Sequence, residues 1–472
     1  MAPTDTSYPV RLGFTPDALA IPDPNHPGLR RAGPRTSAPY GGDSVEVHVC
    51  PATDCLADGS TRPDLERFGF DTVDLSGLDV LQETCVAVRL DGRITDAQAR
   101  AIRAALDGAV LPTVGGATLR VLHLAEEGFI MRTSGPNDMA LVSPRSTGMN
   151  DHGAATSVHA DQDVYGTPMT QLMDGRAPDL FVHDSPDGHN HDAALVLVNL
   201  WIPIQQITRP LVLADGRSID RRRHQLRYGL ATGSFLERDD DLAINDIWMF
   251  LHDDAQQWYF RSEMDHRSAY VFNTLSTPHG AGVLPGEDVA EWCYRALEAV
   301  ESAVARADVA GLVETASAAG RPDLPALTTP PLREAIEAML VLLDEAVQNP
   351  VAVCGERAEA WSAASQAARR RVVRMSLEMR MVVSVGQDGS GTRRAGARSG
   401  HGRRSASRRR ISRYIHNRVD SRPKAQNHSA PAGRPWSTPK STMAKSAMRL
   451  RQAMATMATL MPMPSGVGVF QK

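Results

Sequence analysis

Residues 157–162 read Ser-Val-His-Ala-Asp-Gln and carry no helical signal. On an extended chain, side chains two positions apart point to the same side, so we expect His159 and Asp161 to face one point in space. A second histidine, His279, lies 120 residues further on at the end of an apolar run, and Pro278 just before it favours an extended geometry at a strand end. The pattern predicts a β core that brings the three side chains together.

Two imidazoles and one carboxylate form a facial set of metal ligands that leaves the other half of an Fe(II) ion open for a co-substrate and oxygen. His159, Asp161 and His279 are therefore our candidate metal ligands. A His-x-Asp triplet occurs by chance in many sequences, however, so the spacing alone leaves unrelated core or surface histidines as an alternative.

A competing cluster of histidines lies between the two halves of this pattern, at His183, His189 and His191. His189 and His191 are also separated by one residue, as ligands of a cupin-like metal site are. Their neighbours, residues 184–188, read Asp-Ser-Pro-Asp-Gly and favour a loop exposed to solvent. This cluster remains a second candidate metal site.

The sequence pattern of the region from 156 to 295 is typical of a β domain. Short runs of branched and aromatic residues alternate with turn-rich pieces such as Ala-Asp-Gly at 214–216, which is typical of a sandwich or a barrel. The strands that we expect lie at 193–204, 247–252, 258–261 and 269–275.

The 472 residues divide into four segments by composition. We expect an irregular N-terminal arm, a β domain, a helical region and a disordered basic tail. Their boundaries are 1–42, 43–296, 297–385 and 386–472. The tail holds 18 Lys and Arg against 2 Asp and Glu, whereas the whole chain holds 51 against 55. A frameshifted reading frame would also explain such an abrupt change of composition.

Some local signals outside the central region predict individual elements. Residues 84–90 resemble a strand, and 117–124 another. Between them, Thr95 and Gln98 match a capping box, which predicts a short helix ending near Gly108. In the helical region we expect helices at 332–347, with Pro350 as a stop, and at 358–379.

The five cysteines show no regular spacing that would indicate a disulfide framework. No run approaches the roughly 20 apolar residues that a membrane-spanning helix needs, and the N-terminus lacks the apolar segment of a secretion signal. We expect a soluble, cytoplasmic protein.

Several segments, in order, resemble one family of Fe(II)- and 2-oxoglutarate-dependent oxygenases, the cephem 7α-methoxylase-like and gibberellin-desaturase-like hydroxylases and desaturases. The similar segments, which span about residues 120–300, are 158–162, 198–204, 210–218, 258–264 and 271–281. The chain departs from the family's Asn-x-Trp-Arg-Pro motif at Ile202, and Gly280-Ala281-Gly282 stands where the family has Thr-Ala-Phe. Both departures alter the expected substrate pocket and leave the three candidate ligands in place.

This resemblance implies a double-stranded β-helix (a jelly roll) with flanking helices, and Fe(II), 2-oxoglutarate and O2 as cofactor and co-substrates. It implies hydroxylation or desaturation of a small molecule of secondary metabolism. Asp161 disfavours a halogenase, because related halogenases lack this carboxylate.

The family also places an arginine for 2-oxoglutarate on a strand after the distal histidine. Arg295 matches that context, in Tyr-Arg-Ala-Leu at 294–297, although 287–306 can also be one helix with Arg295 exposed to solvent. Arg132 and Arg217 are the fallbacks, and Arg217 can instead pair with Asp215 at a turn. Arg132, Asn199 and Trp201 are our candidate substrate-pocket residues.

Two other functions remain open. One is a cupin-like metal enzyme or a hydrolase that uses the histidines near His189. The other is a non-catalytic β scaffold whose basic tail binds nucleic acid or anionic surfaces through charge. The tail shows neither the interleaving of aromatic with basic residues nor the zinc-ligand spacing of a defined nucleic-acid module. We therefore expect a small-molecule substrate and no nucleic-acid or membrane partner, and the sequence leaves the oligomeric state undetermined.

Overall fold

The structure, a computed structural model, divides the chain into two units, Met1–Thr392 and Arg393–Lys472. The second unit lies outside the described residues, as does nearly all of the segment that we expected to be a basic tail. The structure describes residues 6–33, 45–56, 59, 61–125, 129–141, 148–150, 152–162, 195–231, 244–317 and 322–387.

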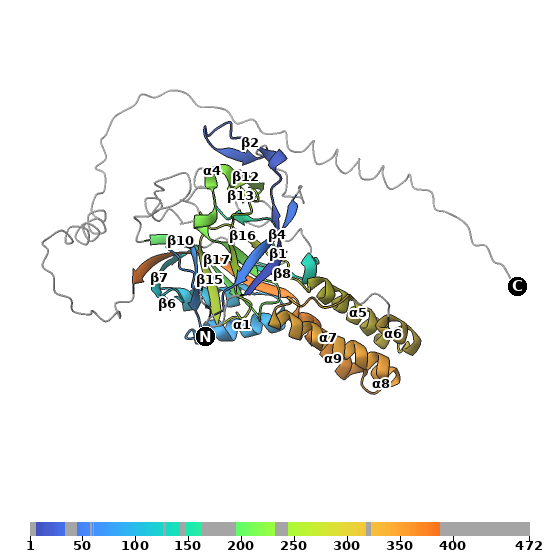
Figure 1. Ribbon diagram of the computed structural model, residues 1–472. Helices are drawn as coiled ribbons and strands as arrows, with labels where there is room; N and C mark the ends of the chain where they lie inside the picture. Colours follow the sequence, from blue (N-terminus) through green and yellow to red (C-terminus); the bar gives the residue numbers. More distant parts are fainter. Residues whose placement is uncertain are drawn as a thin grey trace, which may run out of the picture. The chain divides into compact units, whose positions relative to one another are not determined.

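A seven-stranded sheet forms one layer of the first unit (Figure 1). Its neighbouring strands are antiparallel in every pair. In order across the sheet they are β5 (Phe70–Asp74), β15 (Ser268–Asn273), β10 (Leu195–Pro203), β17 (Arg374–Gln387), β7 (Ala117–Leu124) and β6 (Val110–Pro112), with β8 (Ile130–Ser134) also pairing with β17.

A ten-stranded sheet faces it. In order, its strands are β1 (Thr6–Phe14), β4 (Glu46–Asp54), β14 (Trp258–Phe260), β11 (Leu211–Ala214), β16 (His279–Ala281), β9 (His159–Ala160), β13 (Ile244–Phe250), β12 (Gln225–Ala231), β3 (Arg30–Ala32) and β2 (Ala20–Pro22). Short helical turns lie between some of them, at η1 (Asp17–Leu19), η2 (Pro136–Asp138), η4 (Gly216–Ser218) and α4 (Arg221–His224).

Eight of these strands form a jelly roll, which confirms the expected double-stranded β-helix core. Across the seven-stranded sheet they lie in the order β8-β17-β10-β15, and across the ten-stranded sheet in the order β9-β16-β11-β14. Along the chain the strands alternate between the two sheets, except that β14 follows β11 in the same sheet after the inserted β12–β13 hairpin. This is the arrangement of two interlocked Greek keys.

The N-terminal segment is not an irregular arm. β1 pairs with β4 over nine residues along one edge, and its other edge bonds to residues beside β9 and β16. There Gly13 donates to the carbonyl of Thr156 and accepts from the amide of Val158, and Arg11 exchanges hydrogen bonds with Val283. The apolar side of β1 is buried against the outer face of this sheet. The prolines at 22, 24 and 27 misled the prediction, because they follow the strand.

Two helices cover the outer face of the seven-stranded sheet, α1 (Asp79–Asp91) and α2 (Asp96–Leu106). The capping box is confirmed, with the Thr95 hydroxyl and the Gln98 side chain each bonding the other's backbone amide. The strand expected at 84–90 is wrong, since these residues belong to α1. Leu81, Cys85 and Val88 recur at helical spacing and are buried on the sheet.

A helical insertion separates the last two strands of the jelly roll. It consists of α5 (Glu287–Ala305), α6 (Val309–Ala316), α7 (Pro330–Gln348), α8 (Pro350–Cys354) and α9 (Ala358–Arg371), which pack together beside the sheets (Figure 1). The helix expected at 332–347 is confirmed. The helix expected at 358–379 ends at Arg371, and β17 then returns to the barrel. The boundary that we expected at 296/297 falls inside α5, so this region is an insertion and not a terminal extension.

The returning strand β17 has two chemically different faces. Met375, Leu377, Met379 and Met381 are buried in the apolar cluster with α1 and α2. The alternate side chains point to the opposite side of the strand, toward the other sheet. Those side chains are Arg374, Ser376, Glu378 and Arg380. The interior of the jelly roll at this strand is therefore polar and charged. No helix in the described part of the chain is long and apolar enough to cross a membrane.

The central place of β17 predicts that its apolar face carries much of the stability of the fold. Leu377 is fully buried, so Leu377→Ala should lower the free energy of unfolding by about 2–5 kcal/mol. Val385 lies on the same strand but is 37% exposed, so Val385→Ala should cost well under 1 kcal/mol. Urea unfolding followed by tryptophan fluorescence measures both values, and equal costs would contradict this account of the strand.

Candidate metal centre

The two histidines of the predicted triad lie opposite each other on adjacent strands. β9 and β16 pair antiparallel with His159 directly across from His279, and their ring centroids are 4.5 Å apart. Met249 of β13 is paired with His159 on its other side, and the ring of Phe272 lies 4.6 Å from that of His279. Backbone pairing between strands therefore sets the position of both imidazoles.

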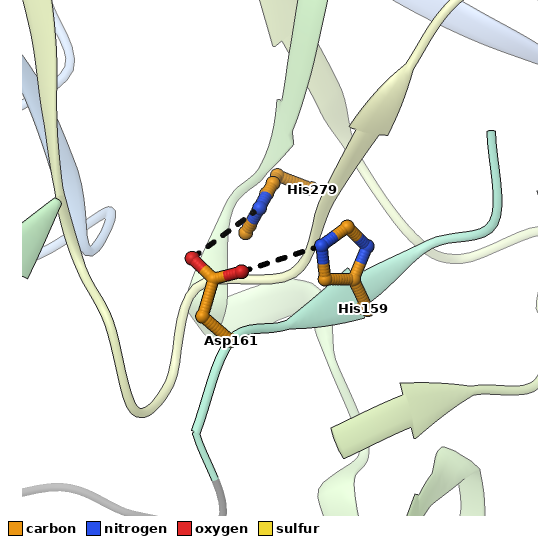
Figure 2. A group of neighbouring side chains, drawn as sticks. All are labelled: His159, Asp161 and His279. Atoms are coloured by element: carbon orange, nitrogen blue, oxygen red, sulfur yellow. Dashed lines mark ion pairs between the residues drawn. The ribbon is translucent and has the colours of Figure 1, made fainter. Parts of the chain in front are cut away.

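Asp161 follows β9 by one residue and turns its carboxylate toward both histidines, as Figure 2 shows. Its Oδ1 lies 3.4 Å from Nε2 of His159, and its Oδ2 lies 3.8 Å from Nε2 of His279. The three side chains are between 6% and 14% exposed. One ligand atom from each lies within 4.8 Å of the other two, so the structure brings the three predicted residues together.

The far nitrogen of each ring has its own partner. Nδ1 of His159 lies 2.8 Å from the carbonyl oxygen of Ser157, and Nδ1 of His279 lies 3.0 Å from that of Thr277. A carbonyl only accepts, so in the neutral rings each Nδ1 carries the proton. Each Nε2 then presents a lone pair toward Asp161. This is the outer contact that metal-binding histidines usually make.

The electrostatics of the site favour the unprotonated ligand set. Burial and the neighbouring His159 lower the pKa of His279 to about 4, against the opposing effect of Asp161. Burial alone would raise the pKa of Asp161, but His279, the hydrogen bond to His159 and the Arg380 guanidinium hold that pKa well below its usual value. At neutral pH the site thus contains a neutral His279 imidazole and an ionised Asp161 carboxylate.

Three lone-pair donors that face one another without a proton between them repel unless a cation joins them. Bonds of about 2.0–2.2 Å from a metal to nitrogen and oxygen would draw such donors slightly closer together than the 3.4 and 3.8 Å observed. The donor types and their arrangement fit a first-row divalent metal with open positions. His159, Asp161 and His279 are the residues that would hold it.

Asn199, expected in the substrate pocket, instead contacts the carboxylate of Asp161. Its Nδ2 donates to Oδ2 of Asp161, and its Oδ1 accepts a 2.9 Å hydrogen bond from the hydroxyl of Thr274. Asn199 is 5% exposed and Thr274 is fully buried. Asn199 is therefore next to the metal centre, on the inner face of β10.

Trp201 lies on the same face of β10 and is 1% exposed. The guanidinium of Arg374 stacks over its ring, 5.4 Å from the ring centroid. Arg374 is 5% exposed, and its Nε and Nη1 are buried without a hydrogen-bond partner among the described residues. Burial lowers the pKa of Arg374 to about 9, although the nearby Glu378 acts in the opposite direction.

Two other arginines lie near Arg374, of which Arg132 has a carboxylate partner and Arg380 has a buried Nε without a hydrogen-bond partner among the described residues. Arg132, expected in the substrate pocket, donates from Nε to both carboxylate oxygens of Glu378 at 2.9 Å. Arg380 lies opposite Asn199 in the β10–β17 register and acts electrostatically on Asp161. Arg132 thus has its counter-charge within the barrel wall, whereas Arg374 has no ion-pair partner within 4 Å among the described residues.

Arg295 is not on a strand, and in this respect the prediction is wrong. It lies in the middle of α5, pairs with Glu291 one turn earlier, and its side chain is 61% exposed. α5 begins at Gly286, whose φ of 101° favours glycine, and Glu287 and Asp288 occupy its first turn. The local match to a strand motif was outweighed by these helical signals.

The remaining candidates are either structural or not described. Arg217 donates from its Nε and Nη2 to the Asp215 carboxylate at a turn, as the alternative interpretation expected. His183, His189 and His191 lie outside the described residues.

Sequence reasoning missed Arg374, Glu378 and Thr274. The signal for the first two was present, because Arg-Met-Ser-Leu-Glu-Met-Arg-Met at 374–381 alternates polar and apolar residues with the period of a strand. It was hidden by the helical residues before it, which extended the predicted helix through this stretch. Thr274 carried no signal of its own.

No protein-family model matches the chain, and no curated protein matches it either. Among solved structures, it is similar to the iron and alpha-ketoglutarate-dependent endoperoxidase NvfI, at 12% identity and a TM-score of 0.38 over 81% of this chain and 99% of that one. The same protein with a different conformation gives 13% identity, a TM-score of 0.39 and the same coverage. Similarity at this level assigns no activity, so the assignment rests on this chain's own residues.

The site predicts that the three residues bind one divalent metal ion. Purified protein should bind one equivalent of Fe(II) or Co(II), and His159→Ala should lose it, because two remaining ligands hold a first-row metal weakly. His189→Ala, a change in the competing histidine cluster, should bind the metal as the unchanged protein does. Equilibrium dialysis with elemental analysis measures the stoichiometry, and loss of metal only in His189→Ala would refute the assignment.

Proposed function

We propose that this protein is an Fe(II)- and 2-oxoglutarate-dependent oxygenase that hydroxylates or desaturates a small molecule. The observation that carries the proposal is the convergence of His159, Asp161 and His279 inside a jelly roll. A set of two histidines and one carboxylate with open positions suits Fe(II) that must also bind a co-substrate and oxygen. The resemblance of several segments to one oxygenase family points to the same chemistry.

The unpaired Arg374 supports 2-oxoglutarate as the co-substrate. A buried guanidinium without a hydrogen-bonded carboxylate is costly, and it calls for an anionic ligand. Its planar fork matches the geometry of a carboxylate. Arg374 lies against Trp201, two residues along β10 from Asn199, which contacts the metal ligand Asp161. A dicarboxylate with one end at the metal would direct its other end toward this arginine.

In this proposal the chain's own residues bind and orient the reactants. When bound, iron and 2-oxoglutarate supply the oxidising chemistry, in which O2 is consumed and 2-oxoglutarate becomes succinate and CO2. Arg374 and the Trp201 ring hold the far carboxylate of 2-oxoglutarate. The Glu378 carboxylate keeps Arg132 neutralised, so that Arg132 does not compete for the co-substrate. Asp161 fills the position that a halide would need, which favours hydroxylation or desaturation.

Turnover of 2-oxoglutarate tests the proposed activity. The protein with Fe(II), ascorbate and O2 should release succinate from 2-oxoglutarate even without its own substrate, through uncoupled turnover. His159→Ala should reduce the rate to background, because it removes a metal ligand. Succinate is measured by mass spectrometry with isotopically labelled 2-oxoglutarate. Equal release by both proteins would show that the triad does not perform the reaction.

The arginine assignment is tested by binding and needs no turnover. With Co(II) in place of iron, Arg374→Gln should weaken the binding of 2-oxoglutarate by about 10- to 100-fold, as loss of a charge-assisted bidentate contact of about 1.5–3 kcal/mol implies. Arg295→Gln, at the arginine that the sequence motif indicated, should bind it unchanged. Isothermal titration calorimetry gives both affinities. The reverse order of effects would return the role to Arg295.

A further inference from the structure

Two consecutive side-chain hydrogen bonds link Asp161 to a threonine in the core. Thr274, which follows β15, contacts Asn199 on β10, and Asn199 contacts Asp161. A backbone hydrogen bond holds Thr274 beside β10, because the amide of Thr274 donates to the carbonyl of Leu197 at 3.1 Å. A metal ligand is thus connected to the opposite sheet through two buried side chains.

The chemistry of the three groups allows one direction of donation. A carboxylate that ligates a metal accepts hydrogen bonds and donates none, and Nδ2 of Asn199 donates to Oδ2 of Asp161. The amide of Asn199 must then direct its NH2 group at Asp161, because its oxygen would be repelled. The amide oxygen therefore faces Thr274, whose hydroxyl must donate. Each member determines the orientation of the next.

We propose that Asn199 is a positioning residue that orients the Asp161 carboxylate for the metal, and that Thr274 fixes the orientation of Asn199. The proposal rests on the metal site of the proposed function, and it replaces the expectation that Asn199 touches the substrate. Rotation about the last bond of an aspartate side chain is broad and nearly free by itself. The hydrogen bond from Asn199 restricts that rotation and keeps the carboxylate of Asp161 facing Nε2 of His159 and of His279.

Burial and position support this role over that of a pocket wall. Asn199 is 5% exposed, and both ends of its amide are already engaged, by Asp161 and by Thr274. The hydrogen bonds at the amide oxygen and the amide nitrogen fix the orientation of Asn199 within the protein, as a positioning role requires. Outer contacts of this kind commonly change metal affinity by 10- to 100-fold when they are removed.

The test uses Co(II) alone as the probe, because it binds without reacting with oxygen and its visible spectrum reports its coordination. The full chain is prepared unchanged and as Asn199→Ala, Thr274→Val, Thr274→Ser and the double variant Asn199→Ala with Thr274→Val. Thr274→Val keeps the shape of threonine and removes the donor, whereas Thr274→Ser keeps the donor. Thermal unfolding of each metal-free protein reports whether the variant folds.

We expect Asn199→Ala to weaken Co(II) binding by about 10- to 100-fold and to change the visible spectrum of the bound ion. Thr274→Val should shift both in the same direction, and Thr274→Ser should restore them. The double variant should be no worse than Asn199→Ala, because the threonine acts only through the asparagine. A purely structural role would lower the unfolding temperature without changing the spectrum.

Unchanged Co(II) affinity and spectrum in a folded Asn199→Ala would overturn the proposal, as would equal behaviour of Thr274→Val and Thr274→Ser. Failure of the proposed oxygenase activity would give different results from failure of the positioning role. If the unchanged protein binds Co(II) through His159 but releases no succinate from 2-oxoglutarate, the proposed activity fails and the positioning role stands. If His159→Ala keeps the metal, the site is elsewhere and both fail.

Discussion

The candidate site depends on the register between two short strands. β9 and β16 pair so that His159 and His279 are directly opposite, and this single pairing brings together residues 120 positions apart in the chain. Side chains alternate along a strand with a period of two, so a slip of one residue would turn one imidazole to the outer face. The outer face is packed with apolar side chains from β1, including Val10 and Leu12. Burying the imidazole there would be costly, which holds the register in place.

The same alternation organises the rest of the interior. The seven-stranded sheet directs its apolar side chains outward against α1 and α2 and presents polar groups inward from β17 and β10. A barrel interior usually fills with apolar residues. Here Arg374, Glu378 and Asn199 lie in it beside an apolar cluster that includes Trp201 and Phe272, at the desolvation cost that buried polar groups carry. Pairing removes that cost for Glu378 and Asn199, and a bound anion would remove it for Arg374.

The helical insertion explains why the last strand was hard to recognise. In the chain, β17 lies 95 residues after His279 and directly follows a helix rich in alanine and arginine. In space it is the neighbour of β10 and β8 and completes the jelly roll. The cation expected on a strand after the distal histidine was therefore assigned to Arg295, 16 residues after His279, where the motif matched but the backbone is helical.

The sequence by itself determined the ligand types, the extended segment that carries His159 and Asp161, and the β character of the core, because these follow from local alternation and side-chain chemistry. The capping box at Thr95 and the helix at 332–347 were equally local. Tertiary structure decided which cation faces the site and what contacts Asp161, since both depend on strands that meet only after folding. Arg374 lies 95 residues after His279 in the sequence, and Thr274, five residues before His279, contacts the site only through Asn199 on β10. No local pattern predicts which strand will lie beside which. The contacts that orient the metal ligands are therefore set by strand pairing across the whole barrel.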